Sequence, residues 1–370
     1  MVLLFYMFLQ TSYSGDLQIR AEVIYFSGQI RILRKILMML DVYKKNQAGL
    51  PEMSRFEGQE FFRIPGPRQV DMFSTFPEHG TNENTGIMLV LHNWGGTWDF
   101  CASWCRILSE KFNLICLSVN YLQSGWRLGD MTYDFGVIQS SDCLRAIYWM
   151  RDFLNRNNIP YNPRRTFSGG ASGGGNLSQM VNKFAPRTFG CIVDMCGMSG
   201  LSDDMAFGNG ILNAGYSRDP EHPAYRTAAM QEIRDLGNPE HLKLQYAANP
   251  DNQVVIIHGM DDEYCPCSAK IQVFQHMVEA GFQPDGYFVT PAMVDGIVIT
   301  GTGHAVGDRP YVIATYGKPY LSERGEFAKI LQDPDDFELK HVVEYPVTGG
   351  SYCMDFTGIP TVSFTGSEKL

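Results

Sequence analysis

Ser172 lies in the sequence Gly-Ala-Ser-Gly-Gly at residues 170–174, which has the pattern G-x-S-x-G. A serine at a sharp turn between a strand and a helix can act as a nucleophile, because the turn pushes its hydroxyl out of the sheet toward the free N–H groups of the helix. Glycines are needed two positions away, because a side chain there would collide with the turn. The flanking sequence favours this arrangement, with a loop and short strand predicted at 162–167 and a helix start at 176–184.

A serine nucleophile needs a base to take its proton and a carboxylate to orient that base. His304 is the candidate base, because it alone of the eight histidines lies in a glycine-flanked loop after the last apolar strand. Asp261 and Asp262 are the candidate acids, and both follow a predicted strand. The order Ser, Asp, His, with each residue at the end of a predicted strand, indicates a catalytic triad.

The sequence His-Asn-Trp-Gly-Gly-Thr at residues 92–97 directly follows an apolar run at 87–91. Backbone N–H groups in a glycine-bearing turn after a buried strand can stabilise negative charge on a substrate oxygen. An ordinary turn, with His92 and Trp94 filling core space, is the alternative. Beside the G-x-S-x-G pattern, the oxyanion-binding interpretation is favoured.

Strands and helices alternate along the chain as is typical of a parallel α/β sheet. Apolar runs predict strands at residues 87–91, 113–119, 189–196, 253–257, 287–289 and 296–300. Helical spacing predicts helices at residues 134–155, 225–236 and 268–280, and the tail from Glu338 onward has the pattern of strands and turns.

Residues 197–252 interrupt this alternation and are too long for an ordinary connection. An insertion at this position is expected to lie above the carboxyl edge of the sheet, where it can cover the site as a lid. Surface decoration without a function is the alternative.

Residues 1–55 are predicted to form an N-terminal extension with an amphipathic helix at 28–46. Basic amphipathic helices also bind anionic membranes, but packing on the main domain or on a partner subunit is favoured here. Residues 1–10 are apolar but too short to span a bilayer. Translation from Met53 is a further alternative.

The composition limits the classes of function. The net charge of −10 over 370 residues argues against nucleic acid as a partner. Nine cysteines, an odd number, favour a reducing compartment and hence a cytoplasmic protein. The pairs Cys101 with Cys105 and Cys265 with Cys267 lack the spacing of a zinc site, so buried free thiols are expected. No metal or cofactor motif is present, and the Gly-rich run at 169–175 lacks the Lys-Ser or Lys-Thr of a phosphate loop.

From these motifs, residues 87–306 resemble the α/β-hydrolase superfamily, which is matched at four motifs in the expected order. The resemblance implies an α/β-hydrolase fold with a mostly parallel central sheet and helices on both faces. The domain is expected at residues 56–370, with 197–252 as the lid-like insertion. The 42 residues from Asp262 to His304 are more than the superfamily often has, which suggests an extra strand or hairpin.

The same resemblance implies a triad of Ser172, Asp262 and His304 and an oxyanion hole made by the backbone N–H groups of Gly173 and the region of Trp94. The loop at residues 92–96 departs from the commoner His-Gly start, which leaves the second donor open.

Asp262 is preferred to Asp261 as the acid, because residues 258–266 are similar to the stretch H-G-x-x-D-x-x-V-P common in these enzymes. In this alignment Cys265 occupies the place of the valine.

More narrowly, Lys-Phe-Ala-Pro-Arg at residues 183–187 and Met-Val-Asp-Gly-Ile-Val-Ile-Thr at 293–300 are similar to an uncharacterised bacterial family. Members of that family are found near surface-glycosylation and flagellin-modification genes. The resemblance carries no established substrate.

The expected activity is that of a serine hydrolase acting on a carboxylic ester, with a small-molecule acyl substrate such as a modified sugar. Amide or peptide hydrolysis uses the same triad and is the first alternative. A non-catalytic binding protein that retains the fold is the second. The sequence gives no indication of the oligomeric state.

Overall fold

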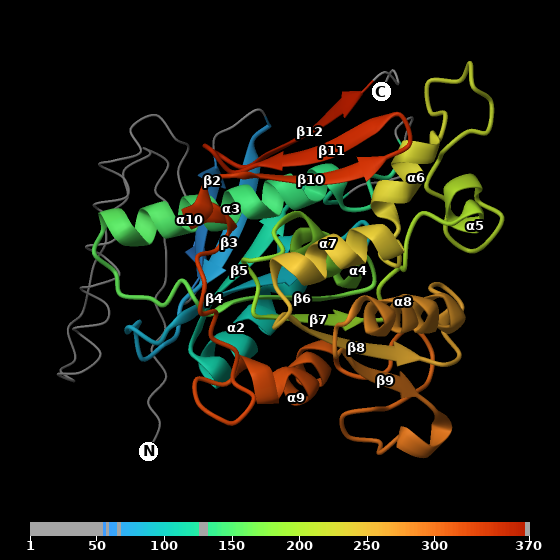
Figure 1. Cartoon of the computed structure of the whole chain (residues 1–370). Coiled ribbons are helices and arrows are strands. Elements are labelled where there is room, and N and C mark those ends of the chain that lie inside the picture. Colours follow the sequence, from blue (N-terminus) through green and yellow to red (C-terminus); the bar gives the residue numbers. More distant parts are fainter. Residues whose placement is uncertain (1–54, 57–58, 65–67, 126–131, 367–370) are drawn as a thin grey trace, which may run out of the picture. The chain divides into compact units, whose positions relative to one another are not determined.

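The computed structural model describes residues 55–56, 59–64, 68–125 and 132–366 (Figure 1). The amphipathic helix predicted for residues 28–46 lies outside the described residues. No helix in the described part of the chain is both long enough and apolar enough to cross a membrane.

The central feature is a mixed sheet of nine strands. Its strands are β1 (Arg55–Phe56), β2 (Gln59–Ile64), β3 (Val70–Thr75), β4 (Gly86–Leu91), β5 (Leu114–Asn120), β6 (Thr166–Ala171), β7 (Cys191–Met195), β8 (Gln253–Gly259) and β9 (Asp285–Val289). They lie in the order β1-β2-β3-β5-β4-β6-β7-β8-β9. Strands β4 to β9 are parallel, and the first three strands form an antiparallel edge.

Helices cover both faces of the sheet (Figure 1). On one face α2 (Ala102–Phe112), which follows the short 3-10 helix at Trp98–Cys101, packs against α9 (Arg309–Leu321). On the other face α3 (Val137–Arg156) packs against α4 (Gly173–Phe184). Every residue of β4, β6, β7 and β8 is buried, as expected for strands covered on both sides. The predicted parallel sheet with helices on both faces is therefore confirmed.

The segment between β7 and β8 contains three helices, α5 (Asp203–Phe207), α6 (Ala228–Arg234) and α7 (Pro239–Ala248). Helix α6 is shorter than the helix predicted at 225–236, and α7 was not predicted. The start of α7 has a clear local cause, because the Asn238 side chain accepts hydrogen bonds from the N–H groups of Glu240 and His241 at 3.1 and 3.2 Å. Helix α7 packs against α8 (Cys267–Ala280).

The predicted strands of the tail form a separate antiparallel sheet. It consists of β10 (Val342–Val347), β11 (Gly350–Asp355) and β12 (Thr361–Gly366), preceded by the short helix α10 (Asp336–Leu339). Strand β10 packs against α6 and α7, and β12 packs against α3.

The strand predicted at residues 296–300 is not formed. The carboxylate of Asp295 accepts hydrogen bonds from the N–H groups of Ile297, Val298 and Ile299 at 2.8, 2.8 and 3.0 Å. A side chain thus takes the donors that a neighbouring strand would have used. His304 follows Asp262 by 42 positions, and this stretch is filled by α8, β9, the 3-10 helix at Pro291–Met293 and this loop, and not by an extra hairpin.

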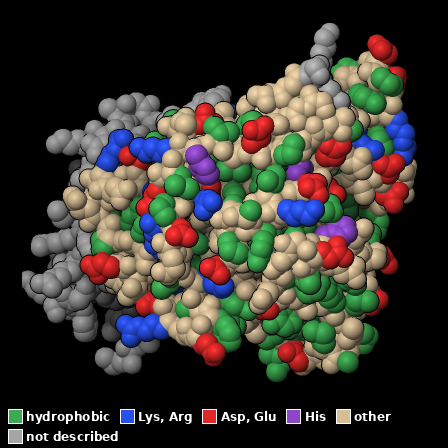
Figure 2. Space-filling model, in the orientation of Figure 1, with side chains coloured by type: hydrophobic (Ala, Val, Ile, Leu, Met, Phe, Trp, Pro, Cys, Tyr) green, Lys and Arg blue, Asp and Glu red, His purple; other side chains and the backbone are tan. Residues whose placement is uncertain are grey.

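The surface near β9 is more apolar than the rest of the face shown in Figure 2, where hydrophobic side chains gather over the region of α8, β8 and β9. Exposed hydrophobic residues here include Val278 in α8 and Val294 and Ile297 in the loop after β9. Strand β9 is an edge strand of the large sheet. This edge therefore lies beside an apolar part of the surface.

Candidate active site

Ser172 joins the end of β6 to the start of α4 in a strained backbone conformation, with φ 57° and ψ −121°. Such a conformation in a residue other than glycine costs roughly 1–3 kcal/mol and persists only when neighbouring groups enforce it. The Ser172 N–H donates to the carbonyl of Met195 in β7 at 2.9 Å, and its carbonyl accepts from the Asn176 N–H at 3.1 Å. The side chain is partly exposed. The sharp turn predicted from the glycine pattern is present.

The glycines around Ser172 are required by close backbone contacts. A Cβ atom at Gly170 would lie 2.6 Å from the carbonyl carbon of Gly174, and one at Gly174 would lie 2.1 Å from the carbonyl oxygen of Leu91. A Cβ at Gly173 would lie 2.6 Å from the backbone nitrogen of Trp94. The loop after β4 is therefore packed directly against the Ser172 turn. The N–H of Gly173, at the first position of α4, has no carbonyl partner within the helix.

The loop that carries Trp94 is held by His92, which is buried. Its ring nitrogens lie 2.9 Å from the Asn93 carbonyl oxygen (Nδ1) and 2.8 Å from the Ser124 hydroxyl (Nε2), and the Tyr121 hydroxyl donates to the His92 carbonyl at 2.6 Å. Burial lowers the pKa of His92 to about 4, so the imidazole is neutral at pH 7. A neutral ring with its proton on Nδ1 donates to Asn93 and accepts from Ser124, which fixes the loop beside Ser172.

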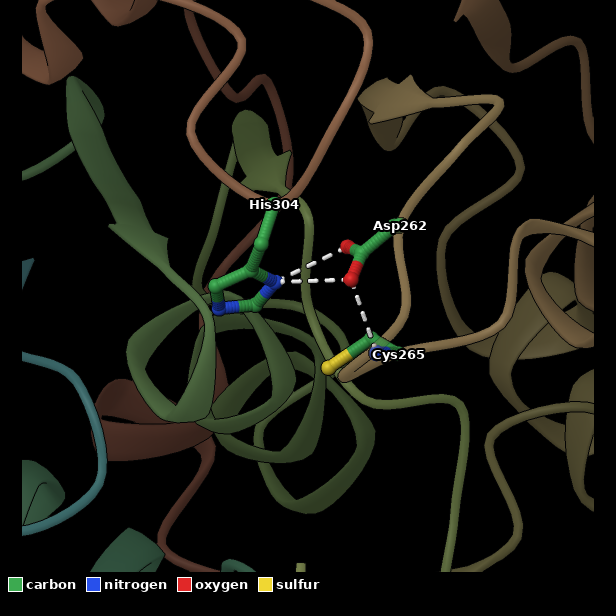
Figure 3. Close-up of side chains that lie close together, drawn as sticks. All are labelled: Asp262, Cys265 and His304. Atoms are coloured by element: carbon green, nitrogen blue, oxygen red, sulfur yellow. Dashed lines mark hydrogen bonds and ion pairs between the residues drawn. The ribbon is translucent and has the colours of Figure 1, made fainter. Parts of the chain in front are cut away.

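His304 and Asp262 lie together, as Figure 3 shows. The Nδ1 atom of His304 lies 2.8 and 3.0 Å from the two carboxylate oxygens of Asp262. The Asp262 side chain is fully buried, and its Oδ1 also accepts from the N–H groups of Tyr264 and Cys265 at 3.0 and 2.9 Å. Asp261 accepts instead from the Thr302 hydroxyl at 2.6 Å.

The electrostatics of Asp262 favour the ionised form. Burial alone would raise its pKa, but hydrogen bonds from His258, His304 and the Cys265 N–H outweigh burial and hold the pKa below its usual range. The His304 side chain is 19% exposed, in contrast to the buried carboxylate. The imidazole is thus open to a substrate on one side and held by a carboxylate on the other.

The His304 loop lies over the end of β8, since a Cβ at Gly259 would be 2.2 Å from the carbonyl oxygen of Thr302. Ser172 follows β6, and β7 separates β6 from β8. With neighbouring strands about 4.8 Å apart, the ends of β6 and β8 are roughly 10 Å apart, a span that a serine and a histidine side chain can close. In the described residues the Ser172 hydroxyl and His304 form no hydrogen bond, so strand order alone places the serine near the His304–Asp262 pair.

The sequence reasoning missed two contacts of the acid loop. His258 places Nε2 2.7 Å from the Cys265 carbonyl oxygen and 3.3 Å from Asp262 Oδ2. The exposed ring of Tyr264 lies 5.1 Å from that of His304. His258 is the histidine that opens the run 258–266, so the motif already contained its signal.

An apolar cluster connects the insertion to both loops of the site. Trp94 stacks on Tyr133 with 3.9 Å between ring centroids. The cluster joins these rings to Cys265 and to residues of the insertion, namely Met198, Leu201, Met205, Ala206, Phe207, Leu212, Ala214, Tyr216 and Met230. The Tyr133 N–H also donates to the Ala214 carbonyl at 2.8 Å. The insertion thus packs beside the predicted oxyanion loop.

One group of side chains in the described residues has the chemistry of metal ligands. Single ligand atoms of Asp262, Cys265 and His304 all lie within 4.8 Å of one another. All nine cysteines are buried and free.

The chain is similar to a known protein family and to several solved structures. A family model described as "Protein of unknown function (DUF2920)" matches residues 128–346. No curated protein matches the chain.

Two solved structures illustrate the likeness in fold. Acylaminoacyl peptidase from Pyrococcus horikoshii has a TM-score of 0.51 at 15% identity, covering 77% of this chain and 44% of the peptidase. A "putative dipeptidyl aminopeptidase IV" from Bacteroides ovatus has a TM-score of 0.51 at 16% identity, covering 73% of this chain and 36% of that protein. This chain therefore spans less than half the length of either. At such identity the likeness to the first structure shows the fold alone, and the predicted α/β-hydrolase fold is confirmed.

Proposed function

The chain belongs to the DUF2920 family of proteins of unknown function, and we propose that it is a serine hydrolase that cleaves a carboxylic ester. The observation that carries the proposal is the hydrogen bond from His304 to the buried Asp262 carboxylate, at the edge of the sheet where Ser172 occupies a strained turn. The substrate that we propose is a small acylated molecule, such as an acylated sugar.

In the proposed reaction the Ser172 hydroxyl attacks the ester carbonyl, and His304 Nε2 takes its proton. Asp262 keeps the other proton of the ring on Nδ1 and stabilises the imidazolium. The N–H groups of Gly173 and Trp94 bind the oxyanion. His304 then protonates the departing alcohol, and water, activated by the same histidine, hydrolyses the acyl-enzyme.

The insertion is proposed to bound the substrate pocket. Its support is the apolar cluster in which Phe207 and Leu212 of the insertion pack with Trp94 and Tyr133. An apolar wall next to the nucleophile excludes water and suits the acyl group of an ester.

A fluorophosphonate probe tests this proposal, because it reacts covalently with an activated serine. The wild-type protein is expected to be labelled, and the Ser172→Ala variant is expected to remain unlabelled. The variant should also hydrolyse esters about 10⁶-fold more slowly than wild type. Ser178→Ala is the matched control: Ser178 lies in α4, buried against the Ser168 hydroxyl at 3.1 Å, and its loss should leave labelling intact. Equal labelling of wild type and Ser172→Ala would refute the proposal.

Assays on matched p-nitrophenyl esters and p-nitroanilides decide between an ester and an amide substrate. The proposal is supported if the enzyme prefers the ester to the anilide by a larger factor than the ratio of their uncatalysed hydrolysis rates. Selective turnover of the anilide would assign the same triad to an amide or peptide hydrolase.

A further inference from the structure

Cys265 places a sulfur atom beside the imidazole and carboxylate of the site. Figure 3 shows the side chain of Cys265 on the same side of the acid loop as the His304 ring. Its Sγ, a ring nitrogen of His304 and a carboxylate oxygen of Asp262 are all within 4.8 Å of one another. The mechanism proposed above uses the nitrogen and the oxygens but has no role for the thiol.

These three atoms match the ligands of zinc in type, and at no more than 4.8 Å from one another they are close enough to share one ion after small shifts. Zinc binds thiolate at about 2.3 Å and imidazole or carboxylate at about 2.0–2.1 Å, in tetrahedral geometry. Ligand atoms around such an ion lie about 3.3–3.6 Å apart. The His304 Nδ1 and Asp262 Oδ2 atoms are 2.8 Å apart, so a shift of roughly half an ångström would admit the ion between them. Sites with three protein ligands and one water are common for this metal.

The charges also balance. The Asp262 carboxylate accepts hydrogen bonds from the N–H groups of Tyr264 and Cys265, which favour its ionised form. One carboxylate, one thiolate and one neutral imidazole offset the two positive charges of Zn²⁺, so no net charge is buried. A free thiol holds its proton at neutral pH, so metal binding must release that proton of Cys265 to solvent.

We propose that Asp262, Cys265 and His304 form an inhibitory site for a thiophilic divalent cation, with Zn²⁺ as its natural ligand. The ion enters from the side of His304, which is 19% exposed while the Asp262 side chain is fully buried. Binding displaces the thiol proton of Cys265 and moves the ring proton of His304 from Nδ1 to Nε2.

This proton arrangement explains why the ion inhibits. With metal on Nδ1 and a proton on Nε2, His304 has no lone pair left to accept the proton of Ser172. This regulatory consequence depends on the proposed hydrolase function, whereas the binding site itself does not. The proposed reaction uses no atom of the Cys265 side chain, so Cys265→Val tests the metal site without removing a group of the triad.

Metal binding is measured directly with Cd²⁺, whose bond to a thiolate gives an ultraviolet charge-transfer band. Full-length wild type and Ser172→Ala are expected to show the band with equal affinity. Cys265→Val and His304→Ala are expected to lose the band or to bind Cd²⁺ at least about tenfold more weakly. Even the loss of a residue that only hydrogen-bonds to a metal ligand weakens metal binding by that factor. Cys267→Val is the matched control: Cys267 is also buried, and its Sγ lies 3.6 Å from the Met260 sulfur, so the band should persist.

The second measurement is Zn²⁺ inhibition of ester hydrolysis in wild type and Cys265→Val. Inhibition that EDTA reverses in wild type, with a half-inhibiting concentration at least about tenfold higher in Cys265→Val, supports the proposal. Equal Cd²⁺ bands or equal inhibition in the two proteins would overturn it. A wild type with the Cd²⁺ band but no hydrolysis would sink the proposed function and leave the metal site standing.

Discussion

At the scale of single residues, the buried carboxylate of Asp262 accepts hydrogen bonds from three different groups. Its oxygens accept from the His304 ring and from two backbone N–H groups, and His258 lies 3.3 Å away. Because the side chain is fully buried, each of these bonds acts in a medium of lower dielectric than water. The carboxylate is thereby kept charged where the imidazolium of the proposed reaction would form.

Replacing Asp262 by Asn should remove the charge and allow the wrong tautomer of His304. We expect kcat for ester hydrolysis to fall by about 10⁴-fold, with the folded structure retained. Asp261→Asn is the control, since Asp261 bonds the Thr302 hydroxyl and not His304, and its activity should stay within a few-fold of wild type. Steady-state kinetics measure kcat for both variants. A larger loss of kcat in Asp261→Asn than in Asp262→Asn would identify Asp261 as the acid.

Candidates for the site could be chosen from the sequence because chemistry restricts the types and the order of residues in a triad. Ser172 and His304 each lie in a glycine-bearing stretch that is visible in the sequence, although the strand predicted just before His304 is not formed. The choice of Asp262 over Asp261 rested on resemblance, because adjacent residues in a loop differ only in the direction of their side chains. His258 was missed although it opens the motif at residues 258–266, because its contacts with Cys265 and Asp262 are visible only in the structure.

At the scale of the elements, the turn after β6 depends on the absence of a side chain at Gly174. A Cβ there would lie 2.1 Å from the Leu91 carbonyl oxygen, and backbone atoms cannot move aside as the end of a side chain can. The same contact holds the loop of Trp94 against the turn. The G-x-S-x-G pattern is thus required by packing between β4 and α4 as well as by the backbone of Ser172.

Gly174→Ala is therefore expected to lower the free energy of unfolding by about 1–3 kcal/mol and to abolish fluorophosphonate labelling. Gly358→Ala is the control, because no atom lies within 4 Å of its added Cβ, and it should change neither quantity by a measurable amount. Urea unfolding and probe labelling test both variants. A Gly174→Ala protein as stable and as reactive as wild type would show that the loop can yield.

Helices and strands were predicted well where burial determines the pattern of apolar residues. They were predicted poorly where the hydrogen bonds of a single side chain determine the local structure. The continuous apolar run of β4 is typical of a central strand that is buried on both faces of a sheet. The run at residues 296–300 also has consecutive apolar residues, Ile297 to Ile299, yet one carboxylate, Asp295, accepts the hydrogen bonds of their backbone N–H groups. Helix α7 lacks a strong apolar stripe, but Asn238 followed by Pro239 is a recognisable helix start that the sequence reasoning did not use.

At the scale of the whole described structure, contacts between segments distant in sequence were beyond prediction. The order of the sheet places β5 between β3 and β4, so the chain crosses over, and no local pattern reports that. The separate sheet of β10 to β12 was visible as strands, but its packing on α3, α6 and α7 was not. His241 marks this packing, because its Nε2 lies 2.8 Å from the carbonyl oxygen of Pro346 in β10.

A fall in pH should destabilise both the packing of β10 on α7 at His241 and the loop after β4 that His92 holds. Burial is the main reason that the pKa values of His241 and His92 are lowered from 6.5 to about 4. The unfolded chain therefore binds more protons between pH 6.5 and 4, so stability is full above pH 6.5 and falls as the pH drops. From pH 7 to 5 we expect each histidine to lower the free energy of unfolding by about 2 kcal/mol, measured by urea unfolding. In His241→Asn the decrease in the free energy of unfolding from pH 7 to 5 should be smaller by that amount. The control His79→Asn, which replaces an exposed histidine, should show the same decrease as wild type. Equal decreases in wild type and both variants would contradict the burial argument.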